Sequence, residues 1–156
     1  MELLLETPRL ILREFVLEDW RAVHEYASDP EVTRYMTWGP NDEAASQHFV
    51  ATVIVKGKEE PRTGYDLAIT LRDKGTLIGG CGIYRRAFGE GEMGYCLHRS
   101  YWNQGYMTEA AGALLEWAFT CGGFHRIYAK CDPRNIGSAR VMEKNGMKKE
   151  GRLRDH

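Results

Sequence analysis

Three consecutive strand patterns in the middle of the chain constrain its fold more than any other feature. Asp66–Leu71 and Thr76–Tyr84 are separated by Asp-Lys-Gly at positions 73–75, a sequence typical of a hairpin turn. Glu92–Leu97 is the next predicted strand, and the glycine inside it often marks a bulge or a close approach to the backbone. These strands predict a sheet at the centre of the fold.

Further strands and helices are predicted on both sides of this central group. Met107–Cys121 has the strongest helical pattern, with apolar residues at helical spacing and a Gly-Gly pair after its end. Other predicted strands are Arg9–Phe15 and Arg126–Cys131; other predicted helices are Glu18–Ser28, a short one after Asp29, one from Asp42 to about Lys56, and Asn135–Asn145. The order strand, helices, three strands, helix, strand, helix predicts a mixed α/β (α+β) fold with helices covering a central sheet.

Composition and charge narrow the class of function. The 156 residues, 43% of them hydrophobic, suffice for one domain, 1–156, with its own core. Lys and Arg number 21 against 22 Asp and Glu, so no basic excess attracts nucleic acid or an anionic membrane. No apolar run is long enough to span a bilayer, and the first residues lack the pattern of a signal peptide. We therefore expect a cytoplasmic protein without a nucleic-acid or membrane partner.

Cysteine and histidine spacing gives no metal motif. None of the four cysteines forms a Cys-x-x-Cys pair, and the five histidines are scattered along the chain. We therefore expect no bound metal, and we interpret the cysteines as small buried residues.

The segment Tyr101–Ala110 is the first candidate binding site, because it joins a strand to the strongest helix. A glycine-containing loop at this point leaves backbone N–H groups unpaired, and the helix dipole adds partial positive charge. These features suit a phosphate or pyrophosphate, although an ordinary turn with Thr108 near the helix cap explains the same residues. The nearby run Gly89–Gly94 matches G-x-G-x-x-G, but a strand follows it, which favours a hairpin turn over dinucleotide binding.

Asn135 and Ser138 form the second candidate site, just beyond the strand Arg126–Cys131. Asn135 is a typical helix cap, and Ser138 lies one turn further along the same helix. Such a polar pair can also hold an amide-bearing ligand and give a proton to a leaving group.

Several segments together resemble the GNAT N-acetyltransferase superfamily: Glu92–Tyr95, Trp102–Ala110, and Asn135–Ser138 with Glu143–Gly146. The opening Thr7–Arg13 is similar to the Rim-type branch, which includes acetyltransferases of ribosomal-protein N-termini. The resemblance implies a mostly antiparallel, twisted sheet whose fourth and fifth strands splay apart. It also implies acetyl-CoA as cosubstrate and a primary amine as acceptor, either a protein N-terminus or a small amine.

The resemblance also implies roles for residues that would bind acetyl-CoA. Backbone groups at Cys96 and Leu97 would contact the pantetheine arm, and Asn135 would position its amide. The loop and first helical turn would hold the pyrophosphate, through Asn103, Gln104, Gly105, Tyr106, Met107 and Thr108. Trp102 and Met107 depart from the residue types that the superfamily commonly has at the first and last loop positions.

Two side chains are candidates for the chemistry of direct acetyl transfer. Glu92 begins the strand that would line the acceptor side and is the candidate base, directly or through a water; a solvated carboxylate in a turn explains it equally well. Ser138 would protonate the departing thiolate, because Met142 stands where many members of the superfamily carry a tyrosine acid. A backbone N–H near Cys96 would stabilise the oxyanion, and no acetyl-enzyme is needed.

Other functions remain open from the sequence. A non-catalytic acyl-CoA sensor or structural module would use the same binding features, and a nucleotide phosphate binder is a weaker alternative. The superfamily usually continues through another strand beyond the position of His156, so we expect that last strand to be missing. The sheet edge exposed in this way would invite a partner chain and make a homodimer.

Overall fold

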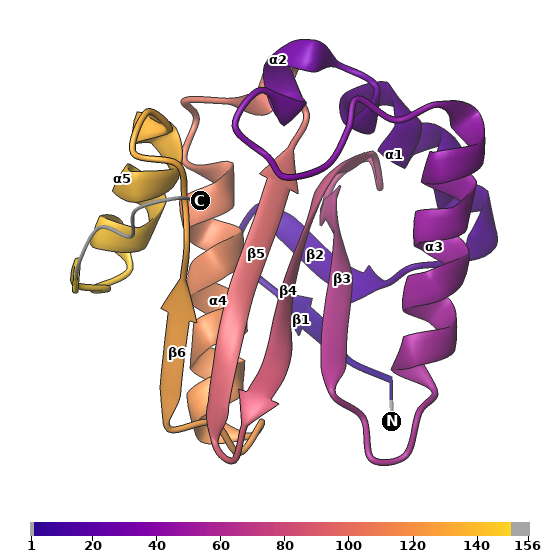
Figure 1. Ribbon diagram of the computed structural model, residues 1–156. Helices are drawn as coiled ribbons and strands as arrows, with labels where there is room; N and C mark the ends of the chain where they lie inside the picture. Colours follow the sequence, from indigo (N-terminus) through magenta and orange to yellow (C-terminus); the bar gives the residue numbers. More distant parts are fainter. Residues whose placement is uncertain (1, 151–156) are drawn as a thin grey trace.

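A six-stranded sheet forms the centre of the computed structural model, which describes residues 2–150 (Figure 1). The strands, in spatial as well as chain order, are β1 Leu4–Glu6, β2 Leu10–Glu14, β3 Gly64–Leu71, β4 Leu77–Ala87, β5 Glu90–Leu97 and β6 Arg126–Ala129. All neighbouring strands pair antiparallel except β5 and β6, which are parallel. The predicted mixed α/β fold with a mostly antiparallel sheet is confirmed.

Helices pack on both faces of this sheet. They are α1 Trp20–Ala27, α2 Pro30–Thr33, α3 Glu43–Gly57, α4 Tyr106–Thr120 and α5 Ile136–Lys144. Side chains alternate between two buried clusters along β3: Leu67 packs into the cluster that includes α4, whereas Ala68 packs into the cluster that includes α1 and α3. The α4 face and the α1/α3 face of the sheet therefore have separate cores.

Local signals in the sequence placed most elements within a few residues. Asp29 and Asp42 cap α2 and α3 as predicted, accepting hydrogen bonds from the N–H groups of Glu31 at 3.0 Å and Ala45 at 2.8 Å. Gly89–Gly94 lies in the tight turn and first half of β5, which confirms the hairpin interpretation. The strand β1 was not predicted, because three residues are too few to show a period of two.

The strands β5 and β6 separate partway along their length. Parallel pairing covers only Glu90–Met93 of β5, whereas antiparallel pairing with β4 continues to Leu97. The N–H of His98 donates to the Ile78 carbonyl of β4 at 2.7 Å. In an antiparallel pair the N–H and carbonyl of every second residue face the partner strand, so those of Tyr95 and Leu97 face away from β4. This is the predicted splay between the fourth and fifth strands, which are β5 and β6 once β1 is counted.

The far edge of the sheet is β6, which pairs only with β5 among residues 2–150. No strand follows α5 within that range; the expectation of a missing last strand also concerns residues 151–156, which lie outside the described part of the chain. The homodimer therefore stays a prediction. Among the described residues, no helix has both the length and the apolar character that crossing a bilayer requires.

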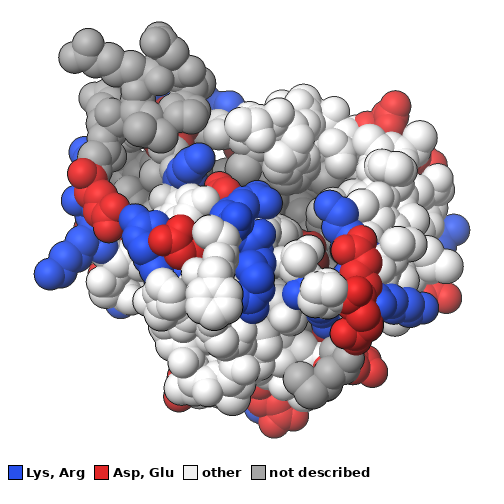
Figure 2. All heavy atoms as spheres, turned by 60° about the horizontal axis from the view of Figure 1, so that its bottom comes forward, with Lys and Arg blue, Asp and Glu red and all other residues white. Residues whose placement is uncertain are grey.

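Charged side chains of both signs share the surface at the lower end of the molecule. Figure 2 shows Lys and Arg interspersed with Asp and Glu there, separated by uncharged residues. Elsewhere the described chain pairs such charges directly, as Arg62 does with Glu14 at 2.8 Å. On the described part of this face, the near-neutral composition thus reflects mixing rather than two opposed patches.

Candidate active site

The loop before α4 has the backbone geometry that an anion site requires. Gly105 is the N-cap residue and has a φ of 80°, a left-handed conformation that glycine adopts without strain. The first intrahelical bond runs from the Glu109 N–H to the Gly105 carbonyl at 3.1 Å. The N–H groups of Tyr106, Met107 and Thr108 precede that bond and lie at the positive end of the helix. Gly105 is the cap itself and Thr108 lies in the first turn after it, so an ordinary helix-starting turn stays an alternative explanation of these residues.

Two unusual residues of this loop have structural explanations. Trp102 donates its indole N–H to the Leu97 carbonyl at 2.9 Å, which ties the loop to the end of β5. Met107 is only 7% exposed and packs into the core on the α4 face, so its side chain points away from the loop. The Gln104 side chain donates back to the Ser100 carbonyl at 3.0 Å. The loop therefore presents its backbone, rather than its side chains, at the start of α4.

Asn135 and Ser138 meet β5 where it has separated from β6. The Asn135 side-chain oxygen accepts from the Ser138 N–H at 3.1 Å, which confirms the predicted helix cap. The hydroxyl oxygens of Ser138 and Tyr95 lie 2.8 Å apart, and the Tyr95 hydroxyl also donates to the Ser138 carbonyl at 3.0 Å. These contacts bring a hydroxyl pair to the open edge of β5.

The sequence analysis did not identify Tyr95 as a functional residue. Burial raises the pKa of Tyr95, and the hydrogen bond with Ser138 lowers it by less, so that the pKa is about 12. The phenol therefore keeps its proton near neutral pH. Met142 lacks a hydroxyl, but a tyrosine from the neighbouring strand reaches the same serine. The signals in the sequence were its place at the end of the segment Glu92–Tyr95, which resembles the superfamily, and its position one residue before Cys96.

Glu92 lies on the opposite face of β5 from Tyr95. Along the strand, Tyr95 packs on the α4 side of the sheet and Cys96 on the α1/α3 side. Side chains alternate along a strand, so Glu92, four residues before Cys96, is on the same side as Cys96. The Glu92 carboxylate pairs with the Arg86 guanidinium at 3.0 Å and is 24% exposed. Ser138, on α5, contacts β5 through Tyr95, whereas the Glu92 side chain is on the other face of β5.

Cys96 is a partly buried thiol on the same face as Glu92. Cys81 is buried, but Cys121 and Cys131 are exposed, so the interpretation of all four cysteines as buried residues is wrong. Burial raises the pKa of Cys96 to about 12, so it is protonated near neutral pH and is a poor nucleophile. Its neighbour Leu97 uses its carbonyl for Trp102, which leaves the Leu97 N–H as the group turned toward the open edge.

A second carboxylate, Asp66, lies on the same face of the sheet as Glu92, two strands away, and was also missed. Asp66 on β3 pairs with Gly82 on β4. Tyr84, two residues after Gly82 and on the same face of β4, pairs with Glu92 on β5. The Tyr84 hydroxyl donates to the Asp66 carboxylate. A Cβ on Gly82 would lie 2.7 Å from the interacting oxygen of each of these side chains, so glycine makes the contact possible. Burial raises the pKa of Asp66, although the hydrogen bond from Tyr84 opposes this.

No group of three or more His, Cys, Asp or Glu side chains is arranged to hold a metal ion within residues 2–150.

Comparisons with known proteins identify the family and the fold. Residues 9–148 match the family model of the acetyltransferase (GNAT) domain. The chain is 41% identical over 147 residues to the uncharacterized N-acetyltransferase YnaD of Bacillus subtilis (strain 168), covering 93% of this chain and 82% of that protein. A GNAT-family acetyltransferase from Bacillus anthracis has a similar crystal structure, with a TM-score of 0.85 and 35% identity over 96% of this chain and 86% of that one.

The fold is also shared with a more distant protein. RimL, a ribosomal L7/L12 α-N-protein acetyltransferase solved in complex with coenzyme A, has a TM-score of 0.84 at 18% identity, covering 96% of this chain and 86% of that one. This likeness shows the common fold. The family model and the relative of 41% identity establish more: this chain belongs to the GNAT family of acetyl-CoA-dependent N-acetyltransferases.

Proposed function

We propose that the enzyme transfers the acetyl group directly from acetyl-CoA to a primary amine, on a protein N-terminus or a small molecule, without an acetyl-enzyme. In this proposal, residues 1–156 act as one N-acetyltransferase domain. The observation that carries it is the 2.8 Å contact between the hydroxyls of Tyr95 and Ser138, at the point where β5 leaves β6. Proton-donating groups are thus available at the edge where an extended thioester arm would lie.

The open edge and the loop fit the parts of acetyl-CoA. The N–H and carbonyl of Tyr95 are turned away from β4, so an amide of the pantetheine arm would pair with them as an added strand does. The same alternation turns the backbone of Cys96 toward β4, so the predicted backbone contact of Cys96 with the arm is wrong. The Leu97 carbonyl is bound to Trp102, which leaves the Leu97 N–H for the acetyl oxygen. Asn135 uses its side-chain oxygen as a helix cap, so its NH2 group is the one left to position a pantetheine amide. The pyrophosphate would be bound by the backbone of the loop and first turn, Asn103, Gln104, Gly105, Tyr106, Met107 and Thr108.

The leaving group needs a proton, and Ser138 would supply it. The amine nitrogen first bonds to the acetyl carbon and gives a tetrahedral oxyanion. As this oxyanion collapses, the carbon–sulfur bond breaks, the sulfur takes the proton of the Ser138 hydroxyl, and the nitrogen releases its extra proton to water. The Tyr95 hydroxyl would then give its proton to the serine oxygen and regain one from water. A backbone N–H beside Cys96, that of Leu97, would stabilise the oxyanion.

The acceptor amine must lose a proton on the other face of β5. Glu92 would take it, directly or through a water, while Arg86 holds one carboxylate oxygen at 3.0 Å. Asp66 and Tyr84 lie on the same face and would line the path of the amine. Donor and acceptor would thus approach the separated strand from different sides.

A panel of amines tests this proposal. The enzyme is incubated with acetyl-CoA and, separately, peptides with free N-termini, polyamines and small amino compounds, and release of free thiol is followed. We expect turnover with one class and an acetylated product of matching mass. Binding of CoA without thiol release for every amine would contradict the proposal and support an acyl-CoA sensor.

A further inference from the structure

We infer that Arg9 is a positioning residue for the diphosphate of acetyl-CoA: it holds the loop before α4 in place and neutralises Glu109 next to it. This inference rests on the proposed role of that loop. It concerns a residue at the start of β2, about a hundred positions away from the loop in the chain.

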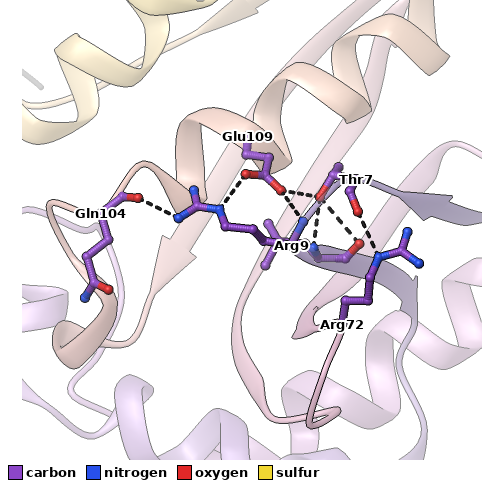
Figure 3. A network of polar contacts seen from close by, with 6 residues as sticks. Thr7, Arg9, Arg72, Gln104 and Glu109 are labelled. Carbon is purple, nitrogen blue, oxygen red and sulfur yellow. Dashed lines mark hydrogen bonds and ion pairs between the residues drawn. The ribbon is translucent and has the colours of Figure 1, made fainter.

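Arg9 contacts both the loop and the helix (Figure 3). Its Nε donates to one Glu109 carboxylate oxygen at 2.8 Å, and its backbone N–H donates to the other at 2.9 Å. Its Nη1 donates to the Gln104 carbonyl at 3.0 Å. One side chain therefore fixes the last loop residue before Gly105 relative to the first turn of α4.

The guanidinium also packs along the N-cap itself. Its Cζ lies 4.1 Å from the centre of the Tyr106 ring, and a Cβ on Gly105 would lie 3.3 Å from its Nη2. The Arg9 side chain is 43% exposed, so it is not held there by burial in the core. Its contacts instead follow three consecutive residues, Gln104 to Tyr106, whose backbone is proposed to meet the diphosphate.

Glu109 explains why a cation is needed at this position. Its side chain is 19% exposed and lies in the first turn of α4, where its negative charge would repel a bound diphosphate. Burial alone would raise the pKa of Glu109, but hydrogen bonds from Thr7, at 2.5 Å, and from Arg9 outweigh burial and lower it. The group is therefore a carboxylate, and Arg9 supplies the compensating positive charge.

The segment that carries Arg9 is held independently of Glu109. The Arg72 side chain donates to the Thr7 carbonyl at 3.0 Å, and the Arg72 N–H donates to the Arg9 carbonyl at 2.9 Å. The Thr7 N–H donates to the Leu10 carbonyl at 2.9 Å. Truncating the Arg9 side chain therefore leaves the start of β2 in place and acts on the loop.

A double-mutant cycle tests the inference, with the Kd of CoA measured by calorimetry and KM and kcat measured for acetyl-CoA. We expect Arg9→Ala to raise the Kd and KM roughly tenfold and to leave kcat within about twofold. Arg9→Lys, which keeps the charge but not the fork of donors, should give an intermediate loss. Glu109→Gln alone should weaken binding, because Arg9 loses the carboxylate that fixes its Nε. Added to Arg9→Ala, it should restore part of the affinity, because no arginine is left to fix and the opposing charge is removed.

Two controls separate this role from general destabilisation. Acetyl-pantetheine lacks the diphosphate, so its KM should be the same for wild type and Arg9→Ala. Arg126→Ala is the matched control. Arg126 pairs with Glu150 at 2.8 Å and is 42% exposed, much like Arg9 with Glu109, but it lies at the opposite end of β5. This variant should leave the Kd of CoA unchanged.

Three results would overturn the inference: wild-type affinity in Arg9→Ala, an equal loss with acetyl-pantetheine, or no recovery in the double variant. Arg9→Lys and Glu109→Gln keep the test decisive if Arg9→Ala does not fold. A wild-type enzyme that fails to bind CoA would instead refute the proposed function, and this measurement precedes every variant.

Discussion

The proposed site has two regions that are built differently. The donor end is the loop at 102–105 with the first turn of α4, and the acceptor face is Asp66, Tyr84 and Glu92. The donor end is one continuous stretch of chain, and the proposal assigns the binding to its backbone. The acceptor face takes one side chain from each of β3, β4 and β5, and its groups are paired with one another or with Arg86. Changes at the donor end should therefore affect binding of the common cosubstrate, and changes on the acceptor face should affect the choice and handling of the amine.

The largest expected effect comes from Gly105→Asp at the donor end. A saturating ligand, at about 100 times its Kd, stabilises the native state by about 2.7 kcal/mol, which appears as a rise in Tm. The Cβ of the aspartate would lie 3.3 Å from Arg9 Nη2, so its carboxylate would engage the guanidinium and add negative charge beside the proposed diphosphate site. Most of the rise with CoA should therefore disappear.

Gly75→Asp is the matched control for this variant. Gly75 also has a left-handed backbone, with a φ of 73°, and nothing lies within 4 Å of its Cβ position. Both variants therefore carry a similar conformational cost of about 1 kcal/mol, but only Gly105→Asp should lose the response to CoA. An unchanged CoA response in Gly105→Asp would mean that the diphosphate binds elsewhere.

Ser138→Ala should have the next largest effect, because Ser138 serves the step that joins the two sides. We expect kcat to fall roughly 10- to 1000-fold while the affinity for CoA stays within a few fold. The assay uses saturating acetyl-CoA, so that a binding defect is not mistaken for a chemical one. Full kcat in this variant would remove Ser138 from the chemistry and leave it only as a residue of the first turn of α5.

Gly82→Ala would break the acceptor face without touching the donor end. Its Cβ would force apart the oxygens of Asp66 and Tyr84, each 2.7 Å away. We expect the KM of the acceptor amine to rise roughly tenfold and the Kd of CoA to stay the same. Gly64→Ala is the control, since its Cβ would contact the Tyr84 ring at an ordinary 3.6 Å. Equal loss of CoA affinity in Gly82→Ala would show that the two sides are not separable.

The smallest expected effect is a pH dependence of stability on the acceptor face. The native pKa of Asp66 is raised above the ordinary value of 3.8, mainly by burial, so the native state binds this proton more strongly than the unfolded state. Asp66 therefore contributes stability that is full below pH 3.8 and is lost as the pH rises through the native pKa.

Asp66→Asn removes this titration. The Tm of the variant minus that of wild type should increase with pH above 3.8 and then level off. Asp73→Asn, in the exposed turn between β3 and β4, controls for the general effect of losing one negative charge. A difference that does not change with pH would mean that the carboxyl group titrates normally.

The two regions also differ in how far the sequence predicted them. The loop, Gly105 and the Asn135 cap were identified correctly as local features, because loop and cap signals lie within a few neighbouring residues. The contacts of Tyr95 with Ser138 and of Arg9 with Glu109 join residues 43 and 100 positions apart. Only strand register and helix packing bring such residues together, so no local pattern predicts them. The Asp66–Tyr84 pair likewise depends on register across β3 and β4.

The burial of Met107 has a consequence for how this enzyme can diverge during evolution. Every residue except proline supplies the same backbone N–H, so a ligand bound by peptide groups exerts little selection on side-chain identity at positions 106–108. Selection on Met107 comes instead from the core that its side chain fills. If the loop binds the cosubstrate as proposed, this residue could change together with its apolar neighbours without loss of binding, whereas position 105 requires a residue that adopts a φ of 80° without strain.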